Sequence, residues 1–409
     1  MYLDKGRSDQ DKLLIPNRVN SVSLFWVGVL FIGTSIYHIP MLIGSIFGSG
    51  MVISLVLIIF FGIVMRYSMW LLGQSVVNAQ HDSEAMIWKT FSPKTAFIPC
   101  LIIFISCLSE IVNAYKYSYY FWNQFLHKFS DHPNIIISDY FFVTTVISCI
   151  LLPGAIFRQD NEYFRVISFA KILIVFSLLI LQIGFLIKNG IPTEHIKMFS
   201  PTLKSVVILF DRLTNYFTFI MFYLIIIGQM KNISLRRIRA FNRIGLLIVL
   251  ISALVFGVVQ YLTCGNSFEP GQLIFDAYPE NSNEQITMIF FCFLQSAFFV
   301  PLFMIPAARS ILGIIHPATP FPKEIWATTC FILAMFSIFI AKFDGSMAEN
   351  ATFISEFFKG MLTFVYPVLM YVVTMKMKPS VFHAVCGTLM GVLYLVYFAA
   401  HIVTFLYYS

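Results

Sequence analysis

The stretch Phe31–Pro40, FIGTSIYHIP, stands inside the first long apolar segment of the chain. It gathers Gly, Thr, Ser, Tyr, His and Pro where a membrane helix would otherwise run unbroken over residues 22–43. In hydrocarbon every backbone N–H and C=O group needs a partner, so such an interruption is tolerated only beside protein or a water-filled cavity. Gly33 relaxes the backbone, and Thr34 and Ser35 offer hydroxyl groups to the backbone groups that are freed. The stretch therefore predicts a helix break at membrane depth.

Two interpretations of this break are open. Unwound backbone beside the positive end of a half-helix suits a carboxylate, and secondary transporters use such half-helix ends to bind their substrates. The alternative is a simple kink whose small residues serve helix packing, which is common in membrane helices. The local residues alone favour the packing kink, so the choice depends on the rest of the chain.

The composition of the whole chain is that of a membrane protein. Of its 409 residues 58% are hydrophobic and only 11% are charged, whereas soluble domains carry about 25% charged residues. Apolar runs of about 20 residues, long enough to cross a bilayer, recur from end to end. They predict eleven helices, over residues 22–43, 50–78, 96–126, 140–157, 163–187, 206–230, 242–263, 285–309, 325–342, 353–375 and 382–406.

The basic residues predict an orientation. If the N-terminus is cytosolic, the segments on the inner side hold 17 Lys and Arg residues, and the outer segments hold five. The positive-inside rule then places the C-terminus outside or in a lumen. The expected location is a plasma membrane or a vacuole-like organelle, and the sequence does not say which. This asymmetry also accounts for the net charge of +7, so no nucleic-acid partner is expected. The basic loop 234–243 could touch anionic lipid, but topology alone explains it equally well.

Four motifs follow one another as in the amino acid/auxin permease family, which belongs to the amino acid–polyamine–organocation group. Residues 33–40 resemble the G-A-G-I-L-x-L-P-like run of the family, with Ser35 in place of the second glycine. Residues 151–168 resemble its polar connection from helix four to five, and residues 258–279 resemble the end of helix seven with its outer loop. Residues 359–372 resemble the Y-P-x-L-x-Y centre of helix ten. The resemblance covers nearly the whole chain.

The resemblance implies an all-α polytopic membrane protein with a 5+5 inverted-repeat core of the LeuT-like kind, broken in helices one and six, plus one extra helix. Helix six carries no Gly or Pro before Gly228, so its break is expected within Asn215–Phe219. The expected parts are a cytosolic tail (1–21), a first five-helix repeat (22–188), a second repeat (205–378) and an eleventh helix with a short outer C-terminus (382–409).

The resemblance also implies a function, namely secondary active transport of amino acids by alternating access, coupled to H⁺ or Na⁺. Its substrate-binding candidates are Gly33, Thr34, Ser35, Tyr37, Asn113, Asn215, Phe217, Thr218 and Phe219. The alternative is a membrane-embedded amino-acid sensor with little or no transport, which Ser35 and the missing glycine of helix six keep open. An enzyme is not expected, and no cofactor is expected besides the coupling ion. The expected partners are an amino acid and the lipid bilayer, and the oligomeric state stays open.

Helix three carries a polar face. Ser106, Glu110, Asn113 and Tyr117 follow one another at spacings of 4, 3 and 4, which places them on one side of a helix. An ionisable group at membrane depth is costly, so it normally faces a cavity or a partner. Glu110 is therefore a candidate proton carrier. The alternative is an ion pair that holds helices together, with Lys116, Arg66 or Lys171 as the partner.

Helix eight carries Gln295 and Ser296 inside an aromatic run, FFCFLQSAFFVP. In sodium-coupled relatives, a polar side chain of helix eight and carbonyl groups of helix one together coordinate Na⁺, which prefers oxygen ligands. The resemblance therefore makes Gln295 and Ser296 candidates for ion coupling, with a Na⁺ site near Thr34 and Ser296 and no other metal. Hydrogen bonding between helices explains the pair equally well.

Overall fold

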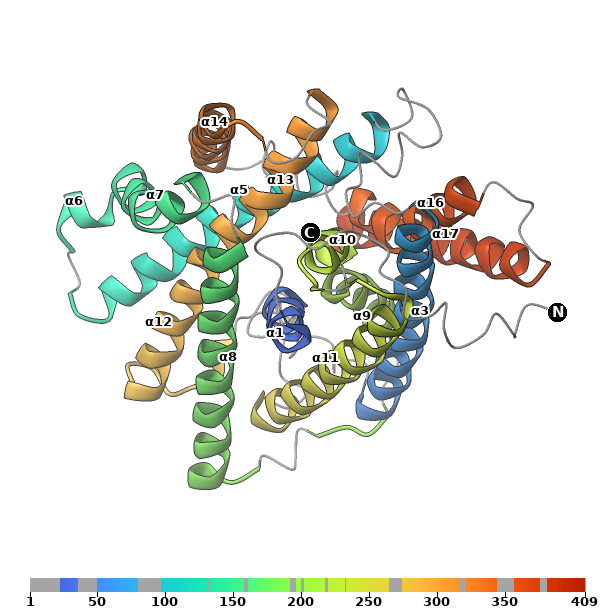
Figure 1. Cartoon of the computed structure of the whole chain (residues 1–409). Coiled ribbons are helices and arrows are strands. Elements are labelled where there is room, and N and C mark those ends of the chain that lie inside the picture. Colours follow the sequence, from blue (N-terminus) through green and yellow to red (C-terminus); the bar gives the residue numbers. More distant parts are fainter. Residues whose placement is uncertain are drawn as a thin grey trace.

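The computed structural model describes residues 23–35, 50–79, 97–130, 133–157, 161–191, 196–199, 202–217, 220–231, 233–264, 274–315, 321–343, 357–375 and 381–408. The regular elements of these residues are helices (Figure 1). In the first half of the chain they are α1 (Leu24–Ser35), α3 (Met51–Ala79), α5 (Phe97–His127), α6 (Ile135–Ser138), α7 (Tyr140–Phe157) and α8 (Asn161–Asn189). In the second half they are α9 (Leu203–Tyr216), α10 (Ile220–Gly228), α11 (Leu235–Cys264), η5 (Ile274–Ala277), α12 (Asn283–Ala297), α13 (Phe299–Ile315), α14 (Lys323–Lys342), η6 (Met361–Val365), α16 (Tyr366–Met375) and α17 (Val381–Tyr408).

Within the described ranges, eight helical spans are long and apolar enough to cross a membrane, and α1 and α7 are shorter apolar helices. Ten of the eleven predicted spans coincide with these helices, the remaining span, 206–230, corresponds to α9 and α10, and most of the ends agree within three residues. The largest difference is α11, which begins at Leu235 rather than at residue 242. The basic segment 234–243, predicted as a loop, is therefore mostly the first turns of a helix. The chain is an integral multi-pass membrane protein.

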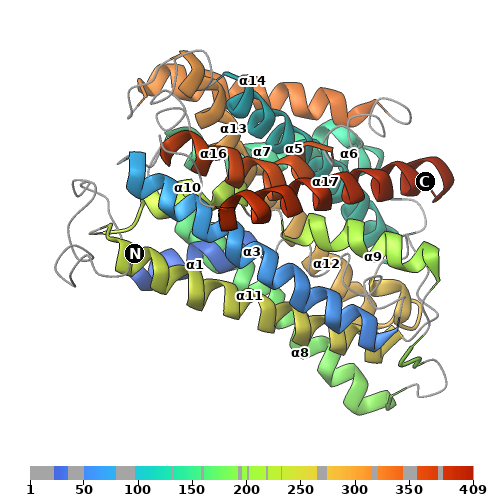
Figure 2. The ribbon, with the colours of Figure 1, turned by 90° about the vertical axis from the view of Figure 1, so that its right-hand side faces the viewer.

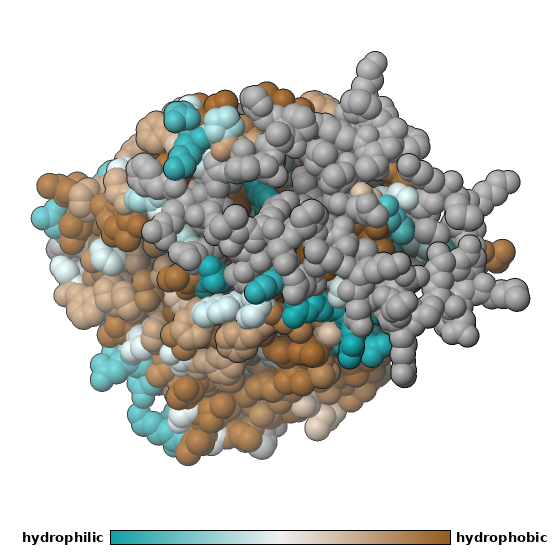
Figure 3. Space-filling model, viewed as in Figure 1, coloured by the Kyte–Doolittle hydropathy of each residue, from teal (hydrophilic) through white to brown (hydrophobic). Residues whose placement is uncertain are grey.

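The outer helices expose apolar side chains along their length. On α14 these include Phe331, Met335 and Phe339, each more than half exposed. Hydrophobic residues likewise cover much of the lower part of the face in Figure 3, where α8 and α11 lie in Figure 1. A helix that is apolar on its outward face as well as its inward face is what hydrocarbon requires, because lipid tails then replace water around it.

The packing brings equivalent helices of the two predicted repeats together. The second helix of the first repeat, α3, packs along α11, which is the second helix of the other repeat (Figure 2). The third helices, α5 and α13, pack in the same way, and so do the fourth, α7 and α14. Such pairing across a two-fold axis is the pattern that an inverted repeat produces. The repeat boundaries themselves remain a prediction.

Helix α1 lies in the middle of the bundle, where α8, α11 and α10 pack against it (Figure 1). A helix in this position is surrounded by protein rather than by lipid, so its polar residues find partners other than hydrocarbon. The predicted first span reaches residue 43, but its part beyond Ser35 lies outside the described residues.

Candidate functional site

The last turn of α1 carries Gly33, Thr34 and Ser35, all buried. A Cβ atom built on Gly33 would lie 2.6 Å from the Cβ and carbonyl oxygen of Ser168, so α1 and α8 touch here. The hydroxyl groups of Thr34 and Ser35 donate to carbonyl oxygens of the preceding turn at 2.6 to 3.0 Å. Close packing of small residues is thus present at this position. Tyr37 lies outside the described residues, and a substrate role for the other three remains a prediction.

The sixth predicted span, 206–230, is interrupted. Helix α9 ends at Tyr216, and α10 begins at Ile220. This interruption falls within the stretch Asn215–Phe219, where the sequence places it. Of its predicted binding residues, Phe217 is fully buried, Thr218 and Phe219 lie outside the described residues, and the structure places Asn215 at the end of α9 without describing its side chain.

An aromatic cluster surrounds the end of α9. Phe217 stacks on Phe61 of α3, with ring centroids 6.0 Å apart and planes 10° apart. Phe61 also meets Phe210 edge-on at 5.0 Å and Phe364 of the π-helical turn η6 at 6.3 Å. Three segments distant in sequence therefore form one apolar wall beside the interruption in helix six.

Glu110 of α5 forms an ion pair with Lys359, and both side chains are only 2% exposed. The ion-pair alternative for Glu110 thus names the right kind of contact but the wrong partner. Arg66 lines a cavity between α3 and α11, Lys171 lies over the Phe299 ring, and Lys116 forms no ion pair with any described residue. Lys359 belongs to helix ten, and a lysine inside an apolar run is the sequence signal that could have revealed it.

Only part of the predicted polar face of helix three is buried. Ser106 and Glu110 are buried, Asn113 is half-buried, and Tyr117 is 45% exposed. The hydroxyl oxygen of Ser106 has no hydrogen-bond partner among the described residues. Because buried polar atoms are normally paired, this hydroxyl stands out on the polar face of helix three.

Lys171 of α8 is a second buried lysine, with its side chain fully covered. Its Nζ lies 3.9 Å from the centroid of the Phe299 ring at the start of α13. One turn earlier on α8 is Ser168, the residue against which Gly33 packs. Lys171 therefore stands where α1, α8 and α13 approach one another. The sequence suggested Lys171 only as a possible ion-pair partner for Glu110.

Gln295 and Ser296 lie at the end of α12, and both are buried. The Oγ of Ser296 accepts a hydrogen bond from Ser118 Oγ of α5 at 3.1 Å, so helix-to-helix bonding exists here. Neither polar atom of the Gln295 side chain has a hydrogen-bond partner among the described residues. A buried amide of this kind is a ready ligand for water, a substrate or an ion.

Helix ten contains a π-helical turn, Met361–Val365, directly after Lys359 and Gly360. Ser68 of α3 donates a hydrogen bond to the carbonyl oxygen of Thr363 at 3.2 Å. The Thr363 hydroxyl itself is buried and has no hydrogen-bond partner among the residues that the structure describes. Single π-turns inside α-helices occur frequently at functional sites. Phe364 belongs to both the turn and the aromatic wall, and Lys359 of the ion pair lies two residues before the turn.

No family model and no curated protein matches this sequence. Solved structures do share its fold. MhsT in complex with L-phenylalanine has a TM-score of 0.60 at 11% identity, over 94% of this chain and 100% of that chain.

Two further structures extend the likeness. Mhp1, a nucleobase-cation-symport-1 family transporter, has a TM-score of 0.61 at 10% identity, covering 95% of this chain and 94% of that one. The Eremococcus coleocola manganese transporter has a TM-score of 0.59 at 13% identity, covering 98% and 88%. At such identities the likeness concerns the fold, and it shows that this chain is an all-α polytopic membrane protein folded like LeuT-like transporters.

Proposed function

We propose that this protein is a secondary active transporter of amino acids, working by alternating access, and that it is not an enzyme. The observation that carries the proposal is that α9 ends at Tyr216 and Phe217 leaves the helix in the middle of the sixth predicted span, while α10 packs beside α1 at the centre of the bundle. Broken helices at the core of such a fold supply the backbone groups that bind substrates and ions in transporters.

In this proposal, different helix ends bind the ammonium group and the carboxylate group of the amino acid. The break expected after Ser35 and the end of α9 at Tyr216 would both present C-terminal carbonyl groups, the negative end of a helix dipole. These ends suit the ammonium group. Helix α10 begins at Ile220 and presents its N-terminal amides, which suit the carboxylate. On this basis the hydroxyls and carbonyls near Ser35 serve the ammonium rather than the carboxylate.

Two observations favour an amino acid over the other substrates of the neighbours. Mn²⁺ prefers carboxylate ligands, and Glu110, a carboxylate at membrane depth, is already neutralised by Lys359. The wall of Phe61, Phe217 and Phe364 beside the interruption suits an apolar or aromatic side chain. The MhsT structure of the same fold holds L-phenylalanine.

Lys171 supports H⁺ rather than Na⁺ as the coupling ion. Its ammonium lies close to Phe299 of helix eight, and its helix meets α1 one turn away. In its protonated form, the lysine would repel a Na⁺ ion bound near Thr34 and Ser296. A lysine can also release and regain a proton, which Na⁺ coupling does not need. Gln295 then serves as a polar ligand of the site rather than as a sodium ligand.

Uptake into proteoliposomes tests the proposal. The purified chain is reconstituted, and a mixture of radiolabelled amino acids is offered under an inward H⁺ gradient, an inward Na⁺ gradient or neither. We expect accumulation under the H⁺ gradient. The test variant is Lys171→Met at equal incorporation, which keeps the length of the side chain, removes the amine and should abolish gradient-driven uptake.

The remaining outcomes are distinct. Accumulation with Na⁺ alone would refute the role of Lys171 but keep the transporter. Binding of an amino acid without accumulation under either gradient would favour the sensor. Absence of both binding and uptake would overturn the amino-acid assignment.

A further inference from the structure

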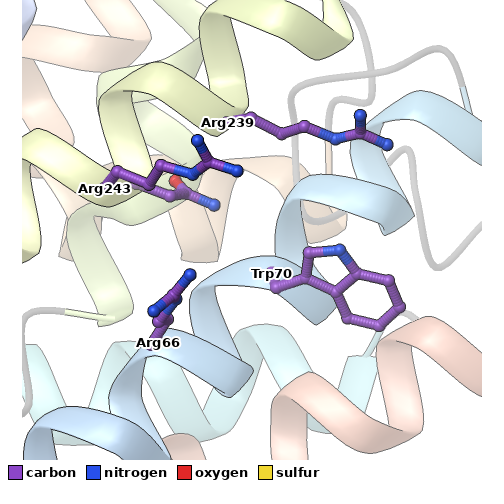
Figure 4. A pocket seen from close by; sticks show the side chains of 5 residues that line it. Arg66, Trp70, Arg239 and Arg243 are labelled. Carbon is purple, nitrogen blue, oxygen red and sulfur yellow. The ribbon is translucent and has the colours of Figure 1, made fainter.

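A cavity of about 200 Å³ lies between α3 and α11, apart from the interruption in helix six. Arg66 and Trp70 of α3 line one side, and Arg239, Asn242 and Arg243 of α11 line the other. Figure 4 shows the arginine side chains of both helices extending into the space between them, with the Trp70 indole at its edge. Trp70 stands four positions after Arg66, and Asn242 and Arg243 stand three and four positions after Arg239, which places the lining residues of each helix toward one face.

The frame of the cavity is fixed by hydrogen bonds. The amide of Asn242 donates to the carbonyl oxygen of Met69 at 3.0 Å and accepts from the hydroxyl of Tyr223 at 2.8 Å. Gly73 lets the helices approach, because a Cβ atom there would lie 2.8 Å from the Ile238 side chain. The arginines thus project from a rigid pair of helices rather than from a loop.

The positive charge of the arginines favours binding of an anion in the cavity. No described residue forms an ion pair or a hydrogen bond with Arg66, Arg239 or Arg243. Like charges gathered in one cavity repel one another, and an anion relieves this repulsion. The guanidinium group presents its donors as a planar fork that matches phosphate oxygens, so several arginines around one cavity suit a phosphate ester best.

The depth of the cavity identifies the source of the phosphate. The exposed large apolar residues of α3 end at Ile63, just before Arg66, and those of α11 begin at Ile244, just after Arg243. Both arginines therefore lie where the lipid-facing surface stops. Beside them lies Trp70, whose ring stacks on His383 of α17 with the ring centroids 5.1 Å apart. Tryptophan is enriched at the level of the lipid headgroups.

We propose that this cavity binds the phosphate group of an anionic phospholipid, in the leaflet on the basic side of the membrane. The charge asymmetry of the loops predicts that this side faces the cytosol. Basic pockets between membrane helices on this side are suited to anionic headgroups. The inference is independent of what the protein transports.

Native mass spectrometry of the purified full chain in detergent tests it, with phosphatidic acid, phosphatidylcholine and inorganic phosphate as the probes. We expect phosphatidic acid to bind more tightly than phosphatidylcholine. Arg66→Gln and Arg243→Gln should each weaken phosphatidic acid binding about five-fold, and the double variant should weaken it about 25-fold. Arg236→Gln is the matched control, because it removes the same charge one turn from Arg239 without lining the cavity. It should change binding less than two-fold.

Three results would overturn the proposal. Equal binding of the two lipids would remove the preference for an anionic headgroup. Equal losses in Arg236→Gln would reduce the effect to net charge. Binding of inorganic phosphate that depends on Arg66 and Arg243, without binding of lipid, would transfer the site to a soluble anion. Should the glutamine variants fail to fold, Arg66→Lys and Arg243→Lys keep the charge but lose the fork, and they should still weaken binding at least two-fold.

Discussion

Removing one partner of the buried pair Glu110–Lys359 should destabilise the protein strongly. Both side chains are 2% exposed, so Glu110→Gln leaves an ammonium without its counter-ion inside the bundle. Breaking a buried pair from one side costs about 3–5 kcal/mol, because the remaining charge stays desolvated. At about 2 °C per kcal/mol for a long chain, the apparent melting temperature should fall by about 6–10 °C.

The assay is the fraction of monodisperse protein left after heating, measured by size exclusion at one heating rate, since membrane proteins often unfold irreversibly. Lys359→Gln should give a similar loss. The double variant Glu110→Gln/Lys359→Gln should regain most of it, because two neutral amides carry no buried charge. Additive losses, or single variants that melt within 1 °C of the unmodified protein, would refute the reasoning. If the double variant is stable and still transports under an H⁺ gradient, Glu110 is not the proton carrier.

Three further predictions, the first with a matched control variant, concern the packing and the ion site. Gly33→Ala should lower the melting temperature, because its Cβ would lie 2.6 Å from the Cβ and the carbonyl oxygen of Ser168. The control is Gly28→Ala on the same helix, whose Cβ meets nothing within 4 Å, so this variant should be neutral or slightly stabilising. Equal effects of the two variants on the melting temperature would contradict the packing of α1 on α8. Tyr223→Phe should cost about 1–2 kcal/mol in a thermal assay, because its buried hydroxyl bonds to Met69 and to a side-chain amide at 2.8 Å. Lys171→Met should remove the pH-gradient dependence of uptake while substrate binding persists, and unchanged uptake would exclude the lysine from coupling.

The helices were predictable because their signal is local. A membrane helix needs an uninterrupted apolar run, and α7 spans Tyr140–Phe157 as the sequence predicts. The break of helix six was predictable at Asn215–Phe219 for the same reason, since polar groups in an apolar run mark a place where the backbone has other partners. The start of α11 at Leu235 was not predictable, because the basic residues before position 242 have the composition of a loop, although their helix propensity is high.

The contacts of the site could not be predicted, because they depend on how distant helices turn toward one another. Lys359 lies far along the chain from Glu110, so no spacing rule pairs them. The closeness of Lys171 to Phe299 is equally non-local. The cavity between α3 and α11 needs two helices to bring three arginines together, and the sequence shows only a lone arginine in one span and a basic segment before another. Phe217 was predicted near the site, but its stacking on Phe61 was not.

The π-helical turn Met361–Val365 has a consequence for how this helix could change over evolution. Such a turn holds one residue more than a regular turn, so it is equivalent to a single inserted residue. Deleting one residue there would restore a regular helix and rotate everything before it by about 100° relative to Tyr366 and the rest of α16. Lys359 would then point away from Glu110 although no residue of the pair had been altered. Deletion of a single codon could therefore break the ion pair between helix three and helix ten. The residues around the turn can change in evolution, but the number of residues in the turn has to stay the same.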